Sequence, residues 1–368
     1  MKKLITIALM LLVAFSAFAQ GAEETAAVES SNDITTILLT DATGIDDKSF
    51  NAAAWRGIVD FYGETVENTP SRGTSYDVIT APTSDQYVPN LKNAADEAYS
   101  LVVATGFTWA DAVTEVAKLY PEQNFAIIDV SWIGLPNVRE YVYAEEQGSY
   151  LVGVAAAMQA KEDGIENPKF GFIGGVPGAT ITKFEVGYIQ GLRSVYPDCE
   201  IVDYYTNNWG APELAKAQAK NWYDNGVYCI FSAAGGSGNG TIQQAKEYRI
   251  AGKNVWAIGV DSDQYADGIY EGEKSAVLTS MIKVVESSLL DSLNKLEDGT
   301  WEGGVVVMDM TNNGVGYSTK NAELCEAAVK AAEAAKADIM SGKIKVEGKY
   351  AAAVAAGLVP ANLKAIDD

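Results

Sequence analysis

Short runs of apolar and β-branched residues alternate along this chain with longer stretches in which apolar residues recur every three or four positions. The first pattern predicts buried strands, and the second predicts amphipathic helices. Strands are expected at Thr36–Thr40, Tyr76–Thr80, Ser100–Ala104, Asn124–Asp129, Val138–Tyr143, Lys169–Gly174, Ile201–Thr206, Tyr228–Ser232 and Val255–Val260. Helices are expected at Ala110–Tyr120, Glu145–Ala160, Thr182–Tyr196, Pro212–Asp224 and Thr241–Arg249. Strand–helix alternation at this spacing predicts an α/β protein with parallel sheets wrapped by helices.

A chain of 368 residues is too long for one such core and suits two. The first series of elements ends near Tyr143, and a second begins with the helix from Glu145. The last third breaks this rhythm, with strand-like runs at Ala276–Ile282 and Gly304–Met310 and helical runs at Lys283–Leu296 and Asn321–Ala337. We therefore predict two lobes between which the chain crosses several times. The first lobe comprises residues 34–143 and 281–300, the second 144–280 and 301–345, and residues 346–368 form a C-terminal tail.

The beginning of the chain has the pattern of a secretory signal peptide. Lys2 and Lys3 precede an apolar run, and Ala17-Phe18-Ala19 supplies a small-residue cleavage site. We expect residues 1–19 to be removed and residues 20–33, which are rich in Ala, Glu and Ser, to form a flexible leader. No cysteine stands near the cleavage site to carry a lipid, so the expected location is the periplasm, without membrane insertion.

Composition then removes several classes of function. The formal net charge of −22 argues against nucleic acid and anionic membranes as partners. The chain contains no histidine, which rules out imidazole bases and histidine-ligated metals, and its three cysteines are too few for a zinc site. Neither a metal nor a cofactor is expected. Carboxylate-only catalysis and binding without chemistry stay open, as does a bridge between Cys199 and Cys229.

The segment from Thr40 to Trp55 carries the clearest functional signal. It joins the first strand to an Ala-rich helix, and such turns are where open α/β sheets collect ligands. We interpret Asp46 and Asp47 as helix-capping residues. Asp41, Phe50 and Asn51 are interpreted instead as ligand-binding, because a ring beside acceptor groups suits a flat polar ligand.

Other predicted strands also end in acids, rings or glycines, which the topology gathers at one edge of each sheet. These residues are Phe107, Trp109, Asp129, Trp132, Trp209, the Gly235–Gly240 turn, Asp261 and Asp263. The two glycine-rich turns, Gly174–Gly178 and Gly235–Gly240, lack both phosphate-loop spacings and any basic residue, so we expect tight turns or backbone contacts with a neutral ligand. Glu145 and Glu146 are interpreted as compensating the dipole of the helix that they open.

Seven segments, in order, resemble the basic membrane protein (PnrA-like) family of ABC-transporter substrate-binding proteins, whose best-known members bind purine nucleosides. They are Asp41 with Asp47–Asn51, Phe125–Asp129, Glu145–Gly153, Phe184–Tyr188, Ala234–Gly238, Ile258–Gln264 and Leu278–Lys283. The resemblance spans roughly Thr35 to Ala337. It implies a type 1 periplasmic-binding-protein fold, with two doubly wound parallel-sheet lobes joined by three hinge strands.

The resemblance also implies roles for individual residues. Phe50 would stack on the base, Asn51 and Asp129 would bind its polar edge, and Asp261 and Lys283 would hold the ribose. Asp41 and Ser49 would lie near the base, with Gly235 in the ligand-facing turn. Trp209 and Phe231 are both candidates for the second stacking ring. Lys283 is expected to open a helix, where its cation would need a salt bridge or a ligand.

The sequence predicts a monomeric extracytoplasmic receptor that captures guanosine, inosine or adenosine and passes it to an ABC permease. Two alternatives remain at this level. The same fold would suit another flat or sugar-like ligand, such as riboflavin. An exported nucleoside hydrolase would use a pair of carboxylates, for which Asp261 and Asp263 are candidates.

Overall fold

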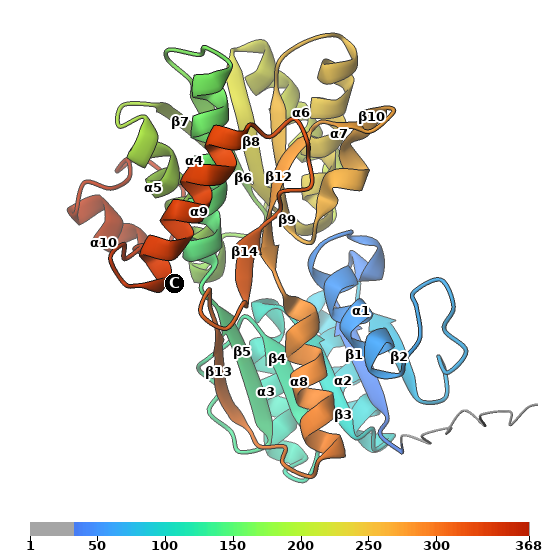
Figure 1. Cartoon of the computed structure of the whole chain (residues 1–368). Coiled ribbons are helices and arrows are strands. Elements are labelled where there is room, and N and C mark those ends of the chain that lie inside the picture. Colours follow the sequence, from blue (N-terminus) through green and yellow to red (C-terminus); the bar gives the residue numbers. More distant parts are fainter. Residues whose placement is uncertain (1–32, 368) are drawn as a thin grey trace, which may run out of the picture. The chain divides into compact units, whose positions relative to one another are not determined.

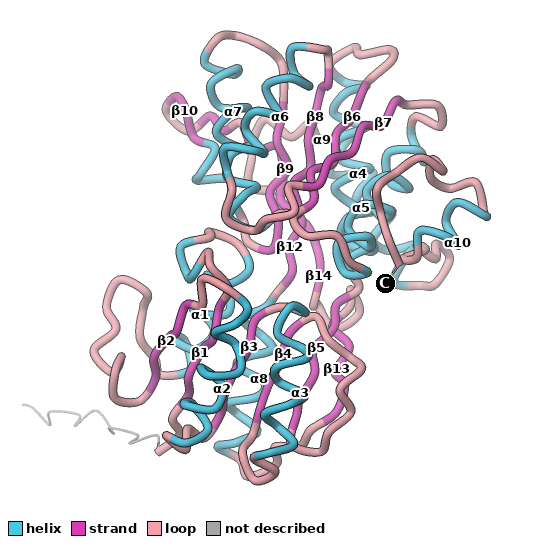
Figure 2. Tube along the Cα trace, turned by 180° about the vertical axis from the view of Figure 1, so that it is seen from behind, coloured by secondary structure: helices cyan, strands magenta, loops and turns pink. Residues whose placement is uncertain are grey.

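The computed structural model describes residues 33–367, in which two six-stranded sheets are each flanked by helices (Figures 1 and 2). Both sheets belong to one compact unit, Ile34–Asp368. The predicted signal peptide and almost all of the predicted leader lie outside the described residues. Among the described residues, no helix is both long enough and apolar enough to cross a membrane.

The first sheet has the strand order β13-β5-β4-β3-β1-β2, and every neighbouring pair is parallel. Its strands are β1 (Thr36–Thr40), β2 (Tyr76–Thr80), β3 (Leu101–Thr105), β4 (Phe125–Ile128), β5 (Val138–Tyr143) and β13 (Gly304–Met308). Its helices are α1 (Phe50–Phe61), α2 (Tyr87–Asp96), α3 (Ala110–Leu119) and α8 (Val285–Glu297). Three short 3₁₀ turns accompany them, at η1 (Gly44–Asp46), η2 (Ser84–Gln86) and η3 (Phe107–Trp109).

The alternation of side chains along β1 explains the helices on both faces of this sheet. Leu38 is buried in the cluster that contains residues of α1 and α8, whereas Ile37 and Leu39 pack with Leu91 of α2 and Val113 of α3. Successive residues of a strand point to opposite faces, so a continuous apolar run requires apolar cover on each side. This is why the strand is apolar throughout instead of alternating with polar residues.

The second sheet repeats this plan with the order β14-β12-β9-β8-β6-β7, in which only β14 is antiparallel to its neighbour. Its strands are β6 (Lys169–Gly174), β7 (Glu200–Tyr205), β8 (Val227–Ala233), β9 (Trp256–Asp261), β12 (Val277–Lys283) and β14 (Val315–Tyr317). Its helices are α4 (Glu145–Glu162), α5 (Ala179–Val195), α6 (Pro212–Asp224), α7 (Asn239–Ile250), α9 (Glu326–Met340) and α10 (Tyr350–Ala355). The turns η4 (Gly235–Gly238) and η5 (Gln264–Gly268) and the short hairpin of β10 (Ile269–Glu271) and β11 (Lys274–Ser275) complete it.

Three segments connect the two sheets: β5 to α4, β12 to α8, and β13 to β14 (Figure 1). They are hydrogen-bonded to one another, since Ala144 N–H donates to the Met308 carbonyl (2.9 Å) and Val284 N–H donates to the Gly314 carbonyl (2.9 Å). The predicted α/β class, the two doubly wound lobes and the three connecting strands are confirmed. Each sheet keeps a 2-1-3-4-5 order of its parallel strands, which places ligands at their carboxyl ends.

Two predictions about the last third of the chain are wrong. Residues 301–345 are predicted in the second lobe, but β13 pairs with β5 along its whole length in the first sheet. Lys283 is predicted to open a helix, but it is the last residue of β12, where it pairs with Val315 of β14, and α8 begins two residues later. In both cases pairing with a distant strand overrides the local pattern.

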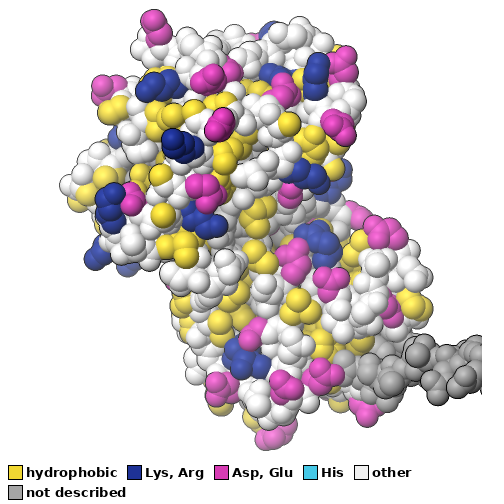
Figure 3. Space-filling view, in the orientation of Figure 1, with side chains coloured by type: hydrophobic (Ala, Val, Ile, Leu, Met, Phe, Trp, Pro, Cys, Tyr) yellow, Lys and Arg dark blue, Asp and Glu magenta, His cyan; other side chains and the backbone are white. Residues whose placement is uncertain are grey.

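Most other predicted boundaries agree with the structure to within three residues, although α9 begins at Glu326 instead of Asn321. The Asn321 amide donates to the Val277 carbonyl (2.8 Å) and so belongs to a turn against the sheet. Cys199 and Cys229 are free cysteines, so the bridge that the sequence left open is not formed. On the face shown in Figure 3, acidic and basic side chains are interspersed and do not form a basic patch.

Candidate functional site

A cavity lies where the carboxyl ends of strands from both sheets meet, and its empty space, counted with the part open to solvent, is about 560 Å³. Both lobes contribute to its lining. The lining residues are Asp41, Thr43, Asp47, Phe50, Asn51, Thr105–Thr108, Asp129, Ile181, Phe184, Trp209, Ala233, Gly235, Val260, Asp261 and Lys283.

Three aspartates reach this cavity because each stands at the end of a strand. Asp41 follows β1, Asp129 follows β4, and Asp261 ends β9. Asp129 and Asp261 have φ angles of 69° and 62°, a left-handed conformation that non-glycine residues seldom adopt. Such strain persists where surrounding structure fixes it, and it is concentrated at functional sites. Here it turns both carboxylates away from their strands and into the cavity.

Four aromatic rings line the same cavity: Phe50 at the start of α1, Phe107 in η3, Phe184 on α5, and Trp209 before α6. Phe107 and Trp209 meet edge to face across the lobes, with their centroids 6.1 Å apart. A glycine at position 175 makes room for the indole, since a Cβ atom there would lie 2.0 Å from Trp209. The glycine-rich turn at Gly174–Gly178 therefore makes room for a ring, a use that the sequence pattern did not predict.

Asp41 is held by a network that uses one of its oxygens. Its Oδ1 accepts hydrogen bonds from the Thr43 N–H (3.0 Å), the Thr43 hydroxyl (2.5 Å) and the Asn51 amide (3.1 Å). The Asn51 amide also donates to the Thr43 hydroxyl (2.9 Å), and its carbonyl accepts from the Thr105 hydroxyl (2.6 Å). Both amide hydrogens of Asn51 are thus used within the chain, while Oδ2 of Asp41 remains available to a ligand.

Lys283 lies at the centre of a buried charged cluster. Its ammonium donates to Asp129 Oδ1 (2.5 Å) and pairs with Glu145 Oε1 (3.1 Å), and its side chain is only 1% exposed. Burial alone would lower the pKa of Lys283, but the carboxylates of Asp129 and Glu145 raise it above its usual value. Lys283 is therefore a permanent cation, which lies 4.9 Å from the ring centroids of both Phe50 and Tyr143.

Asp261 is the carboxylate with the fewest partners in this cavity. It is 7% exposed, and among the described residues its carboxylate accepts no hydrogen bond. Burial raises its pKa to about 8, although Lys283 partly offsets this effect. A desolvated group without a hydrogen-bond partner is stabilised when a ligand supplies that partner.

The raised pKa of Asp261 predicts how stability depends on pH. The folded chain keeps this proton between about pH 4, where an unfolded aspartic acid titrates, and about pH 8. The Asp261 proton therefore makes its full contribution to the free energy of unfolding below about pH 4, and this contribution is lost as the pH rises to about 8. The Asp261→Asn variant should lose this slope, which is at most about 1.4 kcal/mol per pH unit. Urea unfolding at a series of pH values measures it.

The matched control for this experiment is Asp263→Asn, two residues further along the chain. Asp263 is exposed and caps η5 by accepting from the Tyr265 N–H (3.0 Å), which an asparagine also does. Asp263→Asn should therefore keep the slope of the wild type. Equal slopes in the wild type and in Asp261→Asn would show that Asp261 is ionised across this range.

The structure brings eight of the nine predicted site residues to the cavity: Asp41, Phe50, Asn51, Asp129, Trp209, Gly235, Asp261 and Lys283. Ser49 does not line it. The Ser49 side chain is buried, and its hydroxyl has no hydrogen-bond partner among residues 33–367. Asp47 caps α1 as predicted, accepting from the backbone N–H groups of Ser49, Asn51 and Ala52, and it also reaches the cavity.

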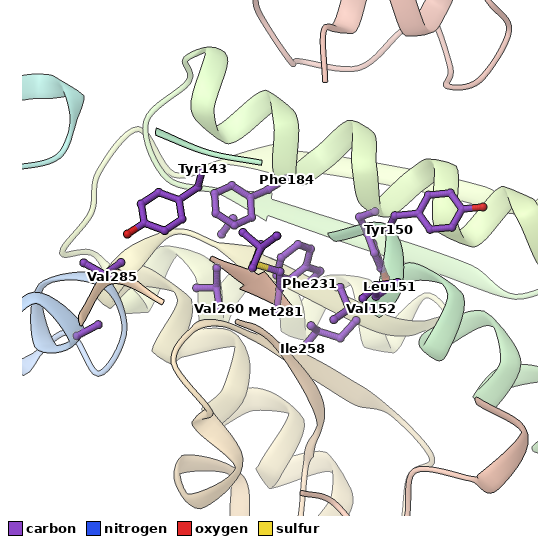
Figure 4. Packing of buried hydrophobic residues seen from close by; sticks show 14 of the residues in the cluster. Tyr143, Tyr150, Leu151, Val152, Phe184, Phe231, Ile258, Val260, Met281 and Val285 are labelled. Atoms are coloured by element: carbon purple, nitrogen blue, oxygen red, sulfur yellow. The ribbon is translucent and has the colours of Figure 1, made fainter. Parts of the chain in front are cut away.

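The structure separates the two candidates for a second ring. Trp209 lines the cavity, whereas Phe231 is fully buried in the core of the second lobe. Figure 4 shows Phe231 beside Met281 in this cluster, with Phe184 and Tyr143 nearby. Phe231 belongs to β8 and points to the face covered by α5, where its ring meets that of Tyr188 at 5.4 Å.

The sequence did not predict the roles of two cavity-lining residues, Thr43 and Phe184, or that of a buried ion-pair partner, Glu145. Thr43 and Phe184 line the cavity, and only Phe184 stood in a recognised segment, without a role. Glu145 does not merely compensate a helix dipole, because it is 1% exposed and pairs with both Lys183 and Lys283. No local pattern distinguishes it from Glu146, since the pairing joins segments that are far apart in the sequence.

Several contacts close the cavity between the lobes. Lys48 pairs with Asp267 (2.7 Å), the Arg56 guanidinium donates to the Ser262 hydroxyl (2.7 Å), and the Asn239 amide donates to the Asp47 carbonyl (3.1 Å). The segment that carries Phe50 is thus fastened to the second lobe.

Among the described residues, no group of three or more potential metal-binding side chains is present.

The chain was compared with known proteins. Residues 34–349 match the family described as "ABC transporter substrate-binding protein PnrA-like". This chain belongs to that family. A PnrA-like family is one of substrate-binding proteins and not of enzymes, so this protein is the substrate-binding protein of an ABC transporter.

Two relatives cover nearly the whole PnrA-like region. The "ABC transporter nucleoside-binding protein BmpA" of Lactococcus lactis subsp. cremoris is 35% identical over 328 residues, which cover 86% of this chain and 90% of that protein. The "CD4+ T-cell-stimulating antigen" of Listeria innocua is 34% identical over 329 residues, which cover 87% of this chain and 90% of that protein.

A solved structure shows the same fold. A solute-binding protein of an ABC transporter system from Aeropyrum pernix K1 superimposes with a TM-score of 0.74 at 24% identity. The match covers 88% of this chain and 98% of the other. Of the two candidates for the carboxylate pair of a hydrolase, Asp261 lines the cavity and Asp263 does not.

Proposed function

We propose that this protein captures a purine nucleoside outside the cytoplasmic membrane and delivers it to the permease of an ABC importer. The observation that carries this proposal is a cavity in which four aromatic rings surround acceptor carboxylates and a single cation. Rings provide flat apolar faces for a base, and carboxylates accept from N–H and hydroxyl donors. The name of the Lactococcus relative supports a nucleoside as the ligand.

Each polar group suits one part of such a ligand. Asp41, with Oδ2 available, accepts from an N–H of the base, and Asn51 holds Asp41 in place. Asp261 forms hydrogen bonds with the two ribose hydroxyls, with Lys283 as its neighbouring cation. Phe50 stacks on one face of the base, and Trp209 is proposed for the other. Asp129 contributes to the site by holding Lys283.

The charges of the lining select against phosphate. Four aspartates face the cavity: Asp41, Asp47, Asp129 and Asp261. Asp261 keeps its proton at neutral pH, and the other three carboxylates outnumber Lys283, the single basic residue among those that line the cavity. The Lys283 cation is already paired with carboxylates of its own. A phosphate group would therefore meet net negative charge at short range in a partly desolvated site. Nucleosides should bind, and their monophosphates should not.

Titration calorimetry of the purified protein tests this proposal. Guanosine, inosine and adenosine should bind, and their 5′-monophosphates should bind at least about tenfold more weakly, which corresponds to about 1.4 kcal/mol. Riboflavin and a free hexose are titrated as well, because they represent the flat and the sugar-like alternative ligands that the sequence left open. Tighter binding of the monophosphates, or binding of riboflavin alone, would overturn the assignment.

Closure of the lobes around the ligand follows from where the rings and carboxylates lie. Phe50 and Asp41 belong to the first lobe, and Asp261 and Trp209 to the second, so one ligand contacts both. A ligand that binds both lobes stabilises the form in which they are close.

We propose a location outside the cytoplasmic membrane, as the signal peptide predicted at residues 1–19 requires.

A further inference from the structure

Lys283 receives its two carboxylates from different lobes. Asp129, at 2.5 Å, follows β4 of the first sheet, and Glu145, at 3.1 Å, is the first residue of α4 in the second. Lys283 itself ends β12, where the chain passes to α8. The ammonium therefore joins two of the three segments that connect the sheets. Burying an ammonium between the lobes is costly unless it is paired with carboxylates, and here one partner comes from each lobe.

Glu145 is held in turn by a second lysine. Its Oε2 pairs with Lys183 of α5 at 3.1 Å, and the Lys183 ammonium also donates to the Tyr143 carbonyl at 2.8 Å. Burial alone would raise the pKa of Glu145, but Lys183 and Lys283 together lower it below its usual value. Glu145 is thus an ionised carboxylate with each oxygen assigned to a different lysine. A carboxylate fixed in this way has a single orientation.

Glu145 and Lys183 do not line the cavity, whereas Asp129 and Lys283 do. The direct contact between the first pair and a residue of the cavity is the one from Glu145 to the Lys283 ammonium. That ammonium is also close to three rings, with centroids 4.9 Å away for Phe50 and Tyr143 and 5.6 Å for Phe184. Phe50 and Phe184 line the cavity, so a displaced ammonium would disturb both the charge and the ring positions of the site.

We propose that Glu145, oriented by Lys183, is a positioning residue that holds the Lys283 ammonium in the ligand site and links that site to the hinge. Without the Glu145 charge, the ammonium is drawn wholly to Asp129 and moves away from the second lobe. The cation then no longer lies where both lobes close on the ligand. This inference rests on the proposed function for its ligand, but not for the position of Lys283.

Glu145→Gln tests the proposal, because it removes the charge and keeps the shape. Guanosine and inosine affinities should fall about 10- to 100-fold, the scale of loss seen at metal sites when a group that orients a ligand is removed. Glu146→Gln is the matched control, since Glu146 is in the same turn, is half-buried and has no hydrogen bond to Lys283 among the described residues. It should bind within about twofold of the wild type.

A crystal structure of ligand-free Glu145→Gln provides a readout that a purely structural role would not move. The Lys283 ammonium should leave its place between the two lobes, and in Glu146→Gln it should stay. Equal affinities in the two variants, or a loss of affinity with Lys283 unmoved, would overturn the proposal. If the wild type binds no nucleoside, the proposed function fails, while the position of Lys283 still decides this inference.

Lys183→Met is the second variant, and it decides the matter if Glu145→Gln does not fold. It leaves Glu145 in place but removes the group that orients it, so nucleoside affinity should fall in the same direction by a smaller factor. The Lys183 side chain is 31% exposed and that of Glu145 is 1% exposed, so replacing Lys183 should disturb the packing less than replacing Glu145. Wild-type affinity in Lys183→Met would refute its part in holding Glu145.

Discussion

The Lys283→Met variant should lose measurable nucleoside binding and unfold at a much lower urea concentration than the wild type. Removing the ammonium leaves the buried carboxylates of Asp129 and Glu145 without one of their partners. Breaking a buried ion pair by removing one member costs about 3–5 kcal/mol, because the remaining charge is uncompensated. Calorimetry with guanosine and urea unfolding monitored by circular dichroism measure the two effects.

A double variant separates the two effects of Lys283. Lys283→Met combined with Asp129→Asn removes both members of the closest pair, and Glu145 keeps its contact with Lys183. Neutral replacement of a whole buried pair is often nearly without cost, so most of the stability should return. Nucleoside binding should not return, since the cation is still missing. A stable single variant that binds guanosine normally would show that Lys283 has no role in the site.

Phe50→Ala should weaken nucleoside binding about 5- to 150-fold, because stacking of a base on an aromatic ring contributes about 1–3 kcal/mol. Phe50 is half-buried and lines the cavity, although it also packs against the core of α1 and its neighbours. Its loss should therefore lower the melting temperature only moderately. Phe50→Tyr keeps the stacking face and should retain most of the affinity.

Phe231→Ala is the control for Phe50→Ala, since each variant removes one phenyl ring but only Phe50 lines the cavity. Phe231 is 0% exposed and packs against Phe172 and Tyr188, so its removal should cost about 3–5 kcal/mol of stability. Binding should persist wherever this variant stays folded. If Phe50→Ala instead melts far below the wild type and binds nucleosides normally, Phe50 is a core residue and the ligand assignment loses its main support.

Strand positions and strand-end residues were predictable because both follow from local information. The predicted runs that became β1, β2, β5 and β6 have the same bounds in the structure. For β1 and β6 the reason is that a strand buried on both faces has an apolar centre. Parallel strands of one sheet share the edge at which they end, so Asp41 and Asp129 could be expected to lie near each other in the first lobe, with Asp261 at the corresponding edge of the second. The left-handed conformations that aim two of these carboxylates could not.

The sequence by itself determined the fold class, the edge that carries the site, and eight of the residues that line the cavity. Only the tertiary structure decided that Lys283 ends a strand, that β13 joins the first sheet, that Trp209 and not Phe231 reaches the cavity, and that Glu145 is a partner of Lys283. Each of these depends on segments that lie far apart in the chain, as with the 154 residues that separate Asp129 from Lys283. Local patterns report burial and periodicity, whereas the partner of a buried charge is fixed only when distant segments pack together.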